Sequence, residues 1–483
     1  MFVGLASFSV FISNAALLIT SLVFALQVVL IALRLAGEIC KPDRSGRTLP
    51  TWQSGTPVFS IHVAIHSEPP AMVCQTLRTL LAQDWAEADY EIIVIDNNTA
   101  DPALWQPVAE FCDGPRNINF IHRMGVGGAK AGALNIALSL TRPDATHIVT
   151  VDADYRVAPH FLSAAARALA DTGADYVQFP QAYDLSSEIA PGVDADLEEY
   201  FRTAAQLADG AEAVLLTGTL CVISHPALLA IGGWSMATTT EDADTGVYLC
   251  RAGYTGHFIS QVVGKGLLPL SLRGLEKQRY RWASGNLQTL LHHTALFATR
   301  RCGLSLPRRL AVLSQLTAWL NLSLLPAVIL ILCLLSGLGS LPIMLLSAAT
   351  ILLSLYDLGW RLIYRGIRDG LSTRHIASAL ASRLALTPVA ALATLATLLG
   401  RRTGFAVTDK SPRTARRGHD ISAHHVLPMV AALLALPTAL HLGPLIGAAT
   451  LALILPLPAA LLTARHLHSY RRAVDCALQK DMP

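Results

Sequence analysis

Three short groups of residues in this chain combine side-chain types and spacings that could carry chemistry. The run from Asp152 to Asp154 (Asp-Ala-Asp) offers two carboxylates that can share a hard divalent cation with a diphosphate. The run from Thr240 to Asp242 (Thr-Glu-Asp) offers a carboxylate that can take a proton from an attacking hydroxyl. The run from Gln278 to Trp282 (Gln-Arg-Tyr-Arg-Trp) offers guanidiniums that bind phosphate oxygens and an indole face for a sugar.

The Asp152 and Asp154 pair follows a predicted buried strand at His147 to Val151, so both carboxylates leave the sheet edge together. Asp194 and Asp196 repeat the same spacing, so the spacing alone carries little weight. Taken alone, Trp282 would fit a core tryptophan and Arg281 a membrane-interface cation. All three groups in this order favour a metal and diphosphate site, a general base and an acceptor site.

Further polar residues follow earlier predicted strands. Asp96 ends the strand at Val94-Ile95, and Glu68 lies in the run His66-Ser67-Glu68-Pro69. These groups could bind a uridine by hydrogen bonds, although turn chemistry alone also explains them. Lys130 lies in a glycine-rich helix start, Gly127 to Asn135, which suits an anion but lacks the phosphate-loop spacing.

The elements that must position these residues form an α/β domain over residues 51–306. Short apolar runs alternate with amphipathic helical patterns at Ala71 to Ala82 and Ala129 to Ser139. The predicted buried strands are Phe59 to Ile65, Glu91 to Ile95, Asn119 to His122 and His147 to Val151. We expect a parallel, doubly wound sheet with ligands at the carboxyl ends of its strands.

Apolar runs are confined to the two ends of the 483-residue chain. Its mean hydropathy is +0.45, which indicates a protein that is in part a membrane protein. Residues 1–50 are predicted to hold one spanning helix, Ser9 to Leu33, followed by a basic flank. The flank favours a cytoplasmic location for the α/β domain and the inner (plasma) membrane as the location of the chain.

Residues 307–483 are predicted to form a second membrane region. Spanning helices are expected at about 311–336, 342–364, 425–441 and 443–465. The apolar segment 376–400 is flanked by basic residues on both sides and contains Arg383 and Pro388, so we expect an interfacial or re-entrant helix there. This gives five spans in total, and six is the alternative.

Two further features narrow the function. The eight cysteines are far apart and show no zinc spacing, so we expect reduced thiols. The basic loop 401–417 would favour anionic lipid headgroups or a phosphorylated substrate, and nothing in the sequence calls for a nucleic-acid partner.

On these motifs the chain resembles the processive family 2 glycosyltransferases, and among them the cellulose synthase-like branch. The resemblance rests on Asp96, Asp152 with Asp154, Thr240 to Asp242 with Thr245, and Gln278 with Arg281 and Trp282. The run Phe405-Ala406-Val407-Thr408-Asp409-Lys410 is similar to the gating-loop motif of bacterial cellulose synthases. The similarity extends over nearly the whole chain.

The resemblance implies a GT-A-type (Rossmann-like) domain that elongates a β-glycan from UDP-glucose with Mg2+ or Mn2+ and passes the product through the membrane. Asp242 would be the base, with Thr240 and Glu241 beside it, and Asp154 with Asp152 would hold the metal. Trp282 would carry the acceptor sugar. The donor would be bound by Glu68, Asp96, Lys130, Asp152, Gln278 and Arg281. A gating loop at 401–420, with Phe405, Val407, Thr408 and Lys410, would close over the nucleotide.

Three alternatives stay open at the level of sequence. The product could be a β-1,3- or β-1,6-glucan or an N-acetylglucosamine polymer. The enzyme could instead move a single sugar onto a lipid or a short glycan acceptor. A transporter or receptor with a nucleotide-binding domain would place charges deep within its spans, where only Asp357 and Arg361 are found, towards one end of theirs. Few predicted spans would also make a homo-oligomer or an export partner useful.

Overall fold

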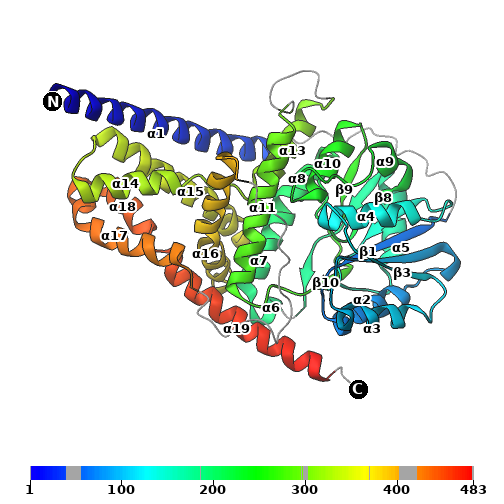
Figure 1. The fold of residues 1–483 in the computed structure, drawn as a ribbon. Coiled ribbons are helices and arrows are strands. Elements are labelled where there is room, and N and C mark those ends of the chain that lie inside the picture. Colours follow the sequence, from blue (N-terminus) through cyan, green and yellow to red (C-terminus); the bar gives the residue numbers. More distant parts are fainter. Residues whose placement is uncertain are drawn as a thin grey trace.

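The computed structural model describes residues 2–39, 56–184, 186–294, 296, 303–368, 370–401 and 421–480. Figure 1 shows two parts side by side, a sheet domain covered by helices and a bundle of long helices. The helix α1 (Phe2–Ile39) leads from the far end of the bundle towards the sheet domain. The C-terminal helices return to the bundle, so the sheet domain is inserted between membrane-type segments.

The main sheet has seven strands in the order β3-β2-β1-β4-β8-β6-β9. Strands β3, β2, β1 and β4 are parallel, whereas β8 runs antiparallel to both β4 and β6. The prediction of a parallel sheet is therefore correct for one half only, and the sheet as a whole is mixed. Its strands are β1 (Phe59–Ile65), β2 (Tyr90–Asn97), β3 (Ile118–Arg123), β4 (His147–Thr150), β6 (Tyr176–Gln178), β8 (Cys221–Ser224) and β9 (Gly256–Phe258).

The predicted strands β1, β2 and β4 form where the sequence is largely apolar, because both faces of these central strands are covered by helices. The strand predicted as buried at Asn119 to His122 is β3, which lies at the edge of the sheet with one buried residue of six. In β1 six of the seven residues are buried, and the seventh, Ala64, is partly buried. A second sheet of three short strands lies beside the first, and its strands are β5 (Arg156–Val157), β7 (Ala182–Tyr183) and β10 (Gly264–Gly266). These short strands carry no apolar run and were not predicted.

The helices around the sheet follow the amphipathic patterns. The predicted helices at Ala71 to Ala82 and Ala129 to Ser139 are α2 and α4. The helices of this domain are α2 (Pro70–Leu81), α3 (Pro102–Cys112), α4 (Ala129–Leu140), α5 (Phe161–Thr172), α6 (Ser186–Ile189), α7 (Pro191–Tyr200), α8 (Gln206–Gly210), α9 (His225–Ala230), α10 (Glu241–Arg251) and α11 (Leu272–His292). Short 3-10 and π turns lie at Glu87–Asp89 and Phe201–Ala205.

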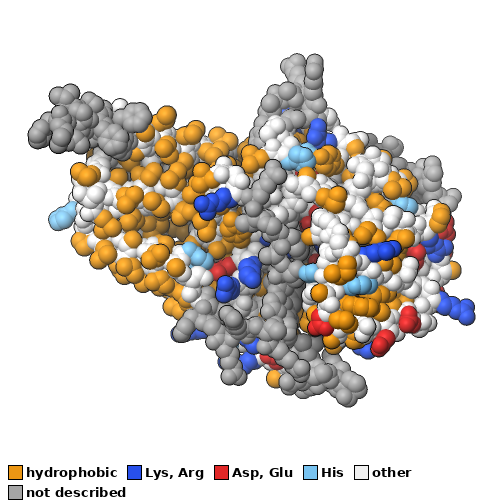
Figure 2. Space-filling view, in the orientation of Figure 1, with side chains coloured by type: hydrophobic (Ala, Val, Ile, Leu, Met, Phe, Trp, Pro, Cys, Tyr) orange, Lys and Arg blue, Asp and Glu red, His pale blue; other side chains and the backbone are white. Residues whose placement is uncertain are grey.

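The remaining helices are α13 (Leu306–Thr317), α14 (Leu324–Ser336), α15 (Leu341–Arg368), α16 (Thr373–Leu398), α17 (Ala423–Leu442), α18 (Pro444–Ala452) and α19 (Pro456–Lys480). Among the described residues, five helical segments are long and apolar enough to cross a membrane: Asn14–Ala36, Leu341–Tyr364, Thr373–Leu398, Ala423–Leu442 and Pro444–Cys476. Figure 2 shows hydrophobic side chains spread over the outer surface of this half of the molecule. These helices indicate a multi-pass membrane protein.

The segment predicted as one spanning helix at about 311–336 is broken in the structure. Helix α13 ends at Thr317 and α14 begins at Leu324, and residues 320–323 between them are not helical. Pro326 lacks an amide hydrogen and so cannot continue the hydrogen-bond ladder from the preceding turn. The side chain of Asn321 instead accepts a hydrogen bond from the Ser323 amide at 2.8 Å, which stabilises the break.

Helix α16 covers the segment predicted as an interfacial helix. It packs against α7, α11 and α19, at the boundary between the bundle and the sheet domain. Figure 1 shows α16 running alongside α11 and α7 rather than along α1 and α15. By length and composition α16 could also cross a membrane, so its interfacial role stays a prediction.

Candidate active site

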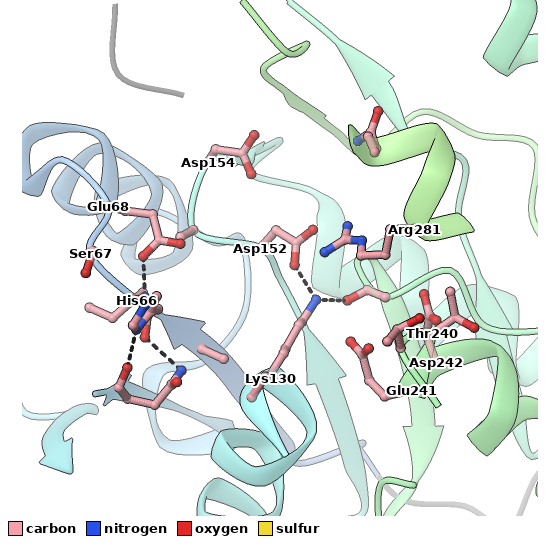
Figure 3. Close-up of a pocket in the computed structure, with 18 of the residues that line it drawn as sticks. His66, Ser67, Glu68, Lys130, Asp152, Asp154, Thr240, Glu241, Asp242 and Arg281 are labelled. Carbon is pink, nitrogen blue, oxygen red and sulfur yellow. Dashed lines mark hydrogen bonds and ion pairs between the residues drawn. The ribbon is translucent and has the colours of Figure 1, made fainter. Parts of the chain in front are cut away.

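A large cavity lies at the carboxyl ends of β1, β2 and β4, as expected for an open α/β sheet. Its volume is about 420 Å3, which is within the range of sites for small ligands and cofactors. All three groups of residues singled out in the sequence line it, together with Lys130 and Glu68. Figure 3 shows Asp152, Asp154, Lys130 and the Thr-Glu-Asp run around one space.

Asp152 and Asp154 come from the loop that directly follows β4. The Asp152 amide donates to the hydroxyl of Thr219 at 3.0 Å, and the Leu267 amide donates to Asp154 Oδ2 at 3.1 Å. Backbone bonds thus fix the loop and one carboxylate before any ligand binds. The two carboxylates supply hard oxygen ligands at one wall of the cavity, with Glu68 on a neighbouring strand end, which fits Mg2+ or Mn2+.

Lys130 lies in the first turn of α4, and its side chain lines the cavity. Its ammonium contacts Asp152 Oδ1 and donates to the carbonyl of Gly218 at 2.8 Å. Burial disfavours the charged ammonium, but Asp152 and Glu241 outweigh burial and raise the pKa of Lys130. The ammonium is therefore a permanent positive charge at the point where Asp152 and the Thr-Glu-Asp run meet (Figure 3).

Asp242 lies in the first turn of α10 and faces the same cavity. Burial, followed by repulsion from Glu241, raises the pKa of Asp242 to about 7, while the Ala243 amide, Lys130 and Arg281 act in the opposite direction. The Ala243 amide donates to Asp242 Oδ1 at 2.8 Å. A carboxylate with a pKa near neutrality can both accept a proton and release it, which is the requirement for a general base.

Gly218 is needed where the chain passes Asp242. Its φ is +85°, a left-handed conformation that residues with a side chain rarely adopt. A Cβ atom at this position would lie 2.8 Å from Asp242 Oδ2 and 3.5 Å from Lys130 Nζ. A side chain at Gly218 would therefore collide with the Asp242 carboxylate and contact the Lys130 ammonium.

Gln278, Arg281 and Trp282 lie on α11 and line the wall of the cavity next to Asp242. Trp282 also lies 5.2 Å, ring to ring, from Trp319, which belongs to the irregular segment after α13. The guanidinium of Arg279 lies over the Trp319 ring at 4.0 Å. The indole predicted to carry an acceptor is thus part of an aromatic stack that extends from the cavity towards the apolar helices.

The structure separates Asp96 from the other predicted residues. Asp96 is buried and does not line the cavity. Its two carboxylate oxygens are engaged by the Thr99 hydroxyl at 2.6 Å and by His122 Nδ1 at 2.6 Å. Glu68 does line the cavity and accepts a hydrogen bond from the His66 amide. Asp96 therefore links the ends of β2 and β3 through its contacts with Thr99 and His122.

Three buried polar atoms in the cavity wall have no hydrogen-bond partner within the described part of the chain. They are Thr217 Oγ1, Thr239 Oγ1 and Gln278 Oε1. Buried polar atoms without partners cost free energy, so each of these atoms suits a polar ligand or ordered water. Thr217 and Thr239 were not predicted as site residues, nor was Gln181, because they occur in apolar or threonine-rich runs without a motif.

A second contact fixes α10 against α11. Asp244 is fully buried and accepts from His293 Nε2 at 3.0 Å, while His292 Nδ1 lies 3.4 Å from the same oxygen. The ligand atoms of these three residues lie close enough to hold a metal ion. Arg251 donates towards His293 Nδ1 at 3.1 Å, which leaves the ring hydrogen on Nε2. The arrangement is therefore a hydrogen-bonded clamp between α10 and α11.

The predicted gating-loop residues Phe405, Val407, Thr408 and Lys410 lie outside the described residues. The chain on the far side of that segment is held next to α11. Glu276, on α11, contacts His424 Nε2 at 3.0 Å and accepts from the Ser422 hydroxyl at 3.3 Å. Ser422 and His424 are thus held at the same helix that carries Gln278, Arg281 and Trp282.

Comparison with known families gives two matches. Residues 60–231 match the family described as glycosyl transferase family 2, and residues 147–364 match the family described as glycosyl transferase family group 2. Together the two matches run from β1 to the end of the predicted span in α15. The matched region therefore includes all three groups of residues that line the cavity.

Two similar proteins are cellulose synthase catalytic subunits. The subunit from Xanthomonas axonopodis pv. citri is 28% identical over 281 residues, 57% of this chain and 37% of that protein. The subunit from Pseudomonas fluorescens is 28% identical over 253 residues, 50% of this chain and 33% of that protein. The similar region thus spans about a third of the length of these relatives.

Among solved structures, a mannosyltransferase from Pyrobaculum calidifontis, in complex with GDP-Man and Mn2+, superposes with a TM-score of 0.55. The two chains are 18% identical, and the superposition covers 80% of this chain and all of the other. At this identity the likeness concerns the fold alone. It confirms the predicted GT-A-type α/β domain with flanking apolar helices.

Proposed function

Since this chain is a family 2 glycosyltransferase, distantly related over about half of its length to bacterial cellulose synthase catalytic subunits, we propose that it polymerises a β-glucan from UDP-glucose. The reaction would be a single inverting displacement, in which an acceptor hydroxyl attacks the anomeric carbon and UDP leaves. The proposal places the enzyme in the inner membrane, with its sheet domain in the cytoplasm.

One observation carries this proposal. Asp242, with a pKa raised to about 7, faces the cavity that Trp282 and Lys130 also line. An acceptor sugar stacked on the indole would present its hydroxyl to the carboxylate, which takes the proton as the new glycosidic bond forms. Lys130 and Arg281 would hold the diphosphate and offset the negative charge that develops on it as the sugar leaves.

A divalent cation held by Asp152 and Asp154 would supply further charge neutralisation at the diphosphate. Asp154→Ala should lower Mn2+ binding, followed by the paramagnetic signal of the bound ion, as well as transfer. Excess EDTA should reproduce the loss of transfer in the unmodified protein. Transfer that survives EDTA would contradict the role of the metal.

The donor and the linkage are tested by one experiment. Membranes that contain the protein are offered radiolabelled UDP-glucose, UDP-N-acetylglucosamine and UDP-glucuronate separately, and the product is analysed for linkage and length. We expect label from UDP-glucose in a β-linked polymer. Label from UDP-N-acetylglucosamine only, or a β-1,3 or β-1,6 linkage, would redirect the proposal to those polymers.

A second candidate is the transfer of one sugar to a lipid or short glycan acceptor. The observation that favours it is the narrow space beyond the site, where a cavity of only about 50 Å3 lies behind Trp282 and Asp242. A translocated glycan would need that passage to widen, in an oligomer or with an export partner, whereas a short acceptor would not. A product limited to one added sugar would support this candidate.

A further inference from the structure

A fully buried glutamine is the last residue of β6. Gln178 is 0% exposed, and it follows Tyr176 and Val177, which are buried as well. A glutamine side chain carries one acceptor and two donor positions, and each of them costs free energy when it is buried without a partner. Gln178 lies outside the set of residues that line the large cavity. Its place in the core therefore has to be explained by its partners in the protein.

The partners of the Gln178 side chain lie mainly in the loop that precedes β8. Its Nε2 atom donates to the carbonyl of Thr219 at 2.8 Å and lies 3.4 Å from that of Leu220, while its Oε1 atom accepts from the Thr217 amide at 2.9 Å. Nε2 also donates to the carbonyl of Phe179 at 2.8 Å. Carbonyls only accept and amides only donate, so the opposite orientation of the side-chain amide would leave all these groups unpaired.

The 217–220 loop needs such support because its backbone is strained and irregular. Gly218 has a φ of +85° and Leu220 a φ of +52°, and a leucine rarely adopts this left-handed conformation. Conformations of this kind persist where the surrounding structure holds them in place. A second side chain contributes, since Gln181 Nε2 donates to the Thr217 carbonyl at 2.6 Å.

The chain on either side of the 217–220 loop is held by other contacts. Before the loop, Gln315 on α13 donates to the Ala213 carbonyl and accepts from the Leu215 amide, both at 2.9 Å. After the loop, β8 pairs with β4 and β6. The Gln178 side chain therefore acts on the shape of the 217–220 loop rather than on the path of the chain around it.

The 217–220 loop contacts charged groups of the candidate active site. The Thr219 hydroxyl accepts from the Asp152 amide at 3.0 Å, and the Gly218 carbonyl accepts from the Lys130 ammonium at 2.8 Å. Gly218 also passes next to the carboxylate of Asp242. Figure 3 shows Lys130 between Asp152 and the Thr-Glu-Asp run. A change in the shape of the loop would therefore move Lys130 and Asp152 relative to the base.

We propose that Gln178 is a positioning residue for glycosyl transfer, because it holds the 217–220 loop in the shape that places Lys130 and Asp152 in the site. Gln178 does not touch the reacting groups and acts through the loop. The proposal rests on the proposed function for the nature of the ligand, although the contacts that carry it belong to the ligand-free protein. If its role were only structural, Gln178 would add stability without affecting Lys130 or Asp152 in particular.

The first experiment measures hydrogen exchange of the ligand-free, full-length protein in detergent by mass spectrometry. Gln178→Met removes every polar partner at nearly the same length, whereas Gln178→Glu keeps an acceptor for the Thr217 amide and removes the donor to Thr219. Peptides that contain the Asp152 amide should exchange about tenfold faster in both variants, because the hydroxyl that holds this amide is no longer fixed. Unchanged exchange at Asp152 would overturn the proposal.

Gln83 provides the matched control, since it is also buried and pairs in the same way. Its Nε2 donates to the carbonyls of Thr79 and Ala158, both at 3.0 Å, and its Oε1 accepts from the Leu162 amide at 3.2 Å. These three residues are not part of the cavity lining. Gln83→Met should lower the melting temperature without faster exchange at Asp152. Equal acceleration in this control would show a general loss of stability and would overturn the proposal.

Thr219→Val covers the case in which the Gln178 variants do not fold. This substitution keeps the shape of the side chain and removes only the acceptor for the Asp152 amide. The same peptides should again exchange faster. Exchange at the rate of the unmodified protein would show that the 217–220 loop does not hold Asp152, which would contradict the proposal.

Transfer kinetics then test whether the loop acts through Lys130. Gln178→Glu should lower kcat up to about 100-fold with a smaller change in the KM for donor, because small displacements near the reacting groups are costly in the transition state. In a Lys130→Met background the same substitution should cost less, whereas independent effects would multiply and would overturn the proposal. Hydrogen exchange needs no transfer, so a protein inactive with UDP-glucose would refute the proposed function and leave the role of Gln178 to be decided by exchange.

Discussion

At the scale of single residues, the candidate site contains charged side chains that lie close enough to shift the pKa of Lys130 and of Asp242. Lys130 contacts Asp152, and Asp242 lies within reach of the fields of Glu241, Lys130 and Arg281. The pKa of Lys130 and the pKa of Asp242 are both raised in part by neighbouring carboxylates. Changes to one charge should therefore be seen in the behaviour of the others.

The raised pKa of Asp242 makes a prediction about pH. As a base, Asp242 must be ionised, so kcat/KM for transfer should rise with pH through an apparent pKa near 7. Asp242→Asn should reduce kcat roughly 100-fold to 10,000-fold while UDP binding is largely retained. Transfer assays across pH with calorimetric UDP titration test both statements, and near-normal synthesis by the variant would contradict the assignment.

The same substitution has an effect of known sign on stability. Because the folded protein raises the pKa of Asp242, the carboxyl adds stability at pH values below its unfolded pKa, and this contribution is lost as pH rises through about 7. Asp242→Asn should therefore be more stable than the unmodified protein above neutral pH. The difference should shrink on acidification, and thermal melts of the ligand-free protein would measure it.

Gly218 gives a prediction with a matched control. Gly218→Ala adds a methyl group 2.8 Å from Asp242 Oδ2 at a φ of +85°, whereas Gly253→Ala adds one at a φ of +96° with nothing within 4 Å. Both variants should lose about 1–2 kcal/mol of stability from the backbone conformation. Transfer should fall sharply only in Gly218→Ala, and equal activities would show that this contact does not matter.

At the scale of elements, α10 and α11 must keep a fixed separation, since one carries the base and the other carries Trp282. Asp244 and His293 hold the two helices together, with Ser235 donating to the same carboxylate. This contact involves none of the residues that line the cavity. It should therefore act on the reaction only through the position of Asp242.

Asp244→Asn should weaken the bonds from His293 and Ser235 and cost about 1–3 kcal/mol of unfolding free energy. We expect kcat to fall more than the KM for donor rises, because the base is displaced while the donor pocket is kept. Asp209→Asn, which removes a similar carboxylate partner of His257 on β9, is the control. If both variants lose stability and keep kcat, the clamp has only a structural role.

The segment 402–420 remains a proposed gating loop. If it closes over bound donor, Thr408→Ala with Lys410→Ala should lower transfer sharply while metal binding is unchanged. His424, which follows this segment, is held at Glu276 on α11. Polymer made at the unmodified rate by the double variant would show that the motif match is coincidental.

The bounds of the strands and helices show which elements can be predicted from the sequence. The bounds of the four parallel strands were predicted to within two residues, because their sequences are largely apolar. The predicted burial is wrong for β3, which lies at the edge of the sheet with one buried residue of six. The short strands β5, β7 and β10 were not predicted, since they carry two or three residues each without an apolar pattern. The break after α13 was missed because Asn321 and Pro326 interrupt a run that is otherwise apolar.

Within the site, the sequence predicted the chemical groups better than their surroundings. Asp152, Asp154, Asp242, Lys130 and Trp282 all line one cavity, as their motif order predicted. Asp196 was set aside because its spacing with Asp194 looks fortuitous, yet it is a buried partner of two arginines distant in sequence. Such long-range pairs leave no local pattern, and Thr217 and Gly218 likewise gain their roles only through the fold.

At the scale of the whole molecule, the hairpin turns support one direction of insertion. The turn between α14 and α15 and the turn between α17 and α18 lie at the same end as the start of α1, away from the sheet (Figure 1). Reporters fused after Arg47, after Arg417 and at the C-terminus should therefore report the cytoplasm, and one between Gly337 and Ser340 the outside. An external position for Arg417 would make α16 a true span.

The pairing of Arg34 with Asp357 also sets an order of events during synthesis. The two residues are 323 positions apart, so the ribosome adds Asp357 roughly 15–60 seconds after it adds Arg34. Throughout that interval α1 carries an arginine whose partner does not yet exist. The long side chain of Arg34 can keep its guanidinium at the lipid headgroups until α15 has been inserted. The bundle can therefore be completed only late in synthesis, and a chain that ends before α15 would carry Arg34 without Asp357, its carboxylate partner.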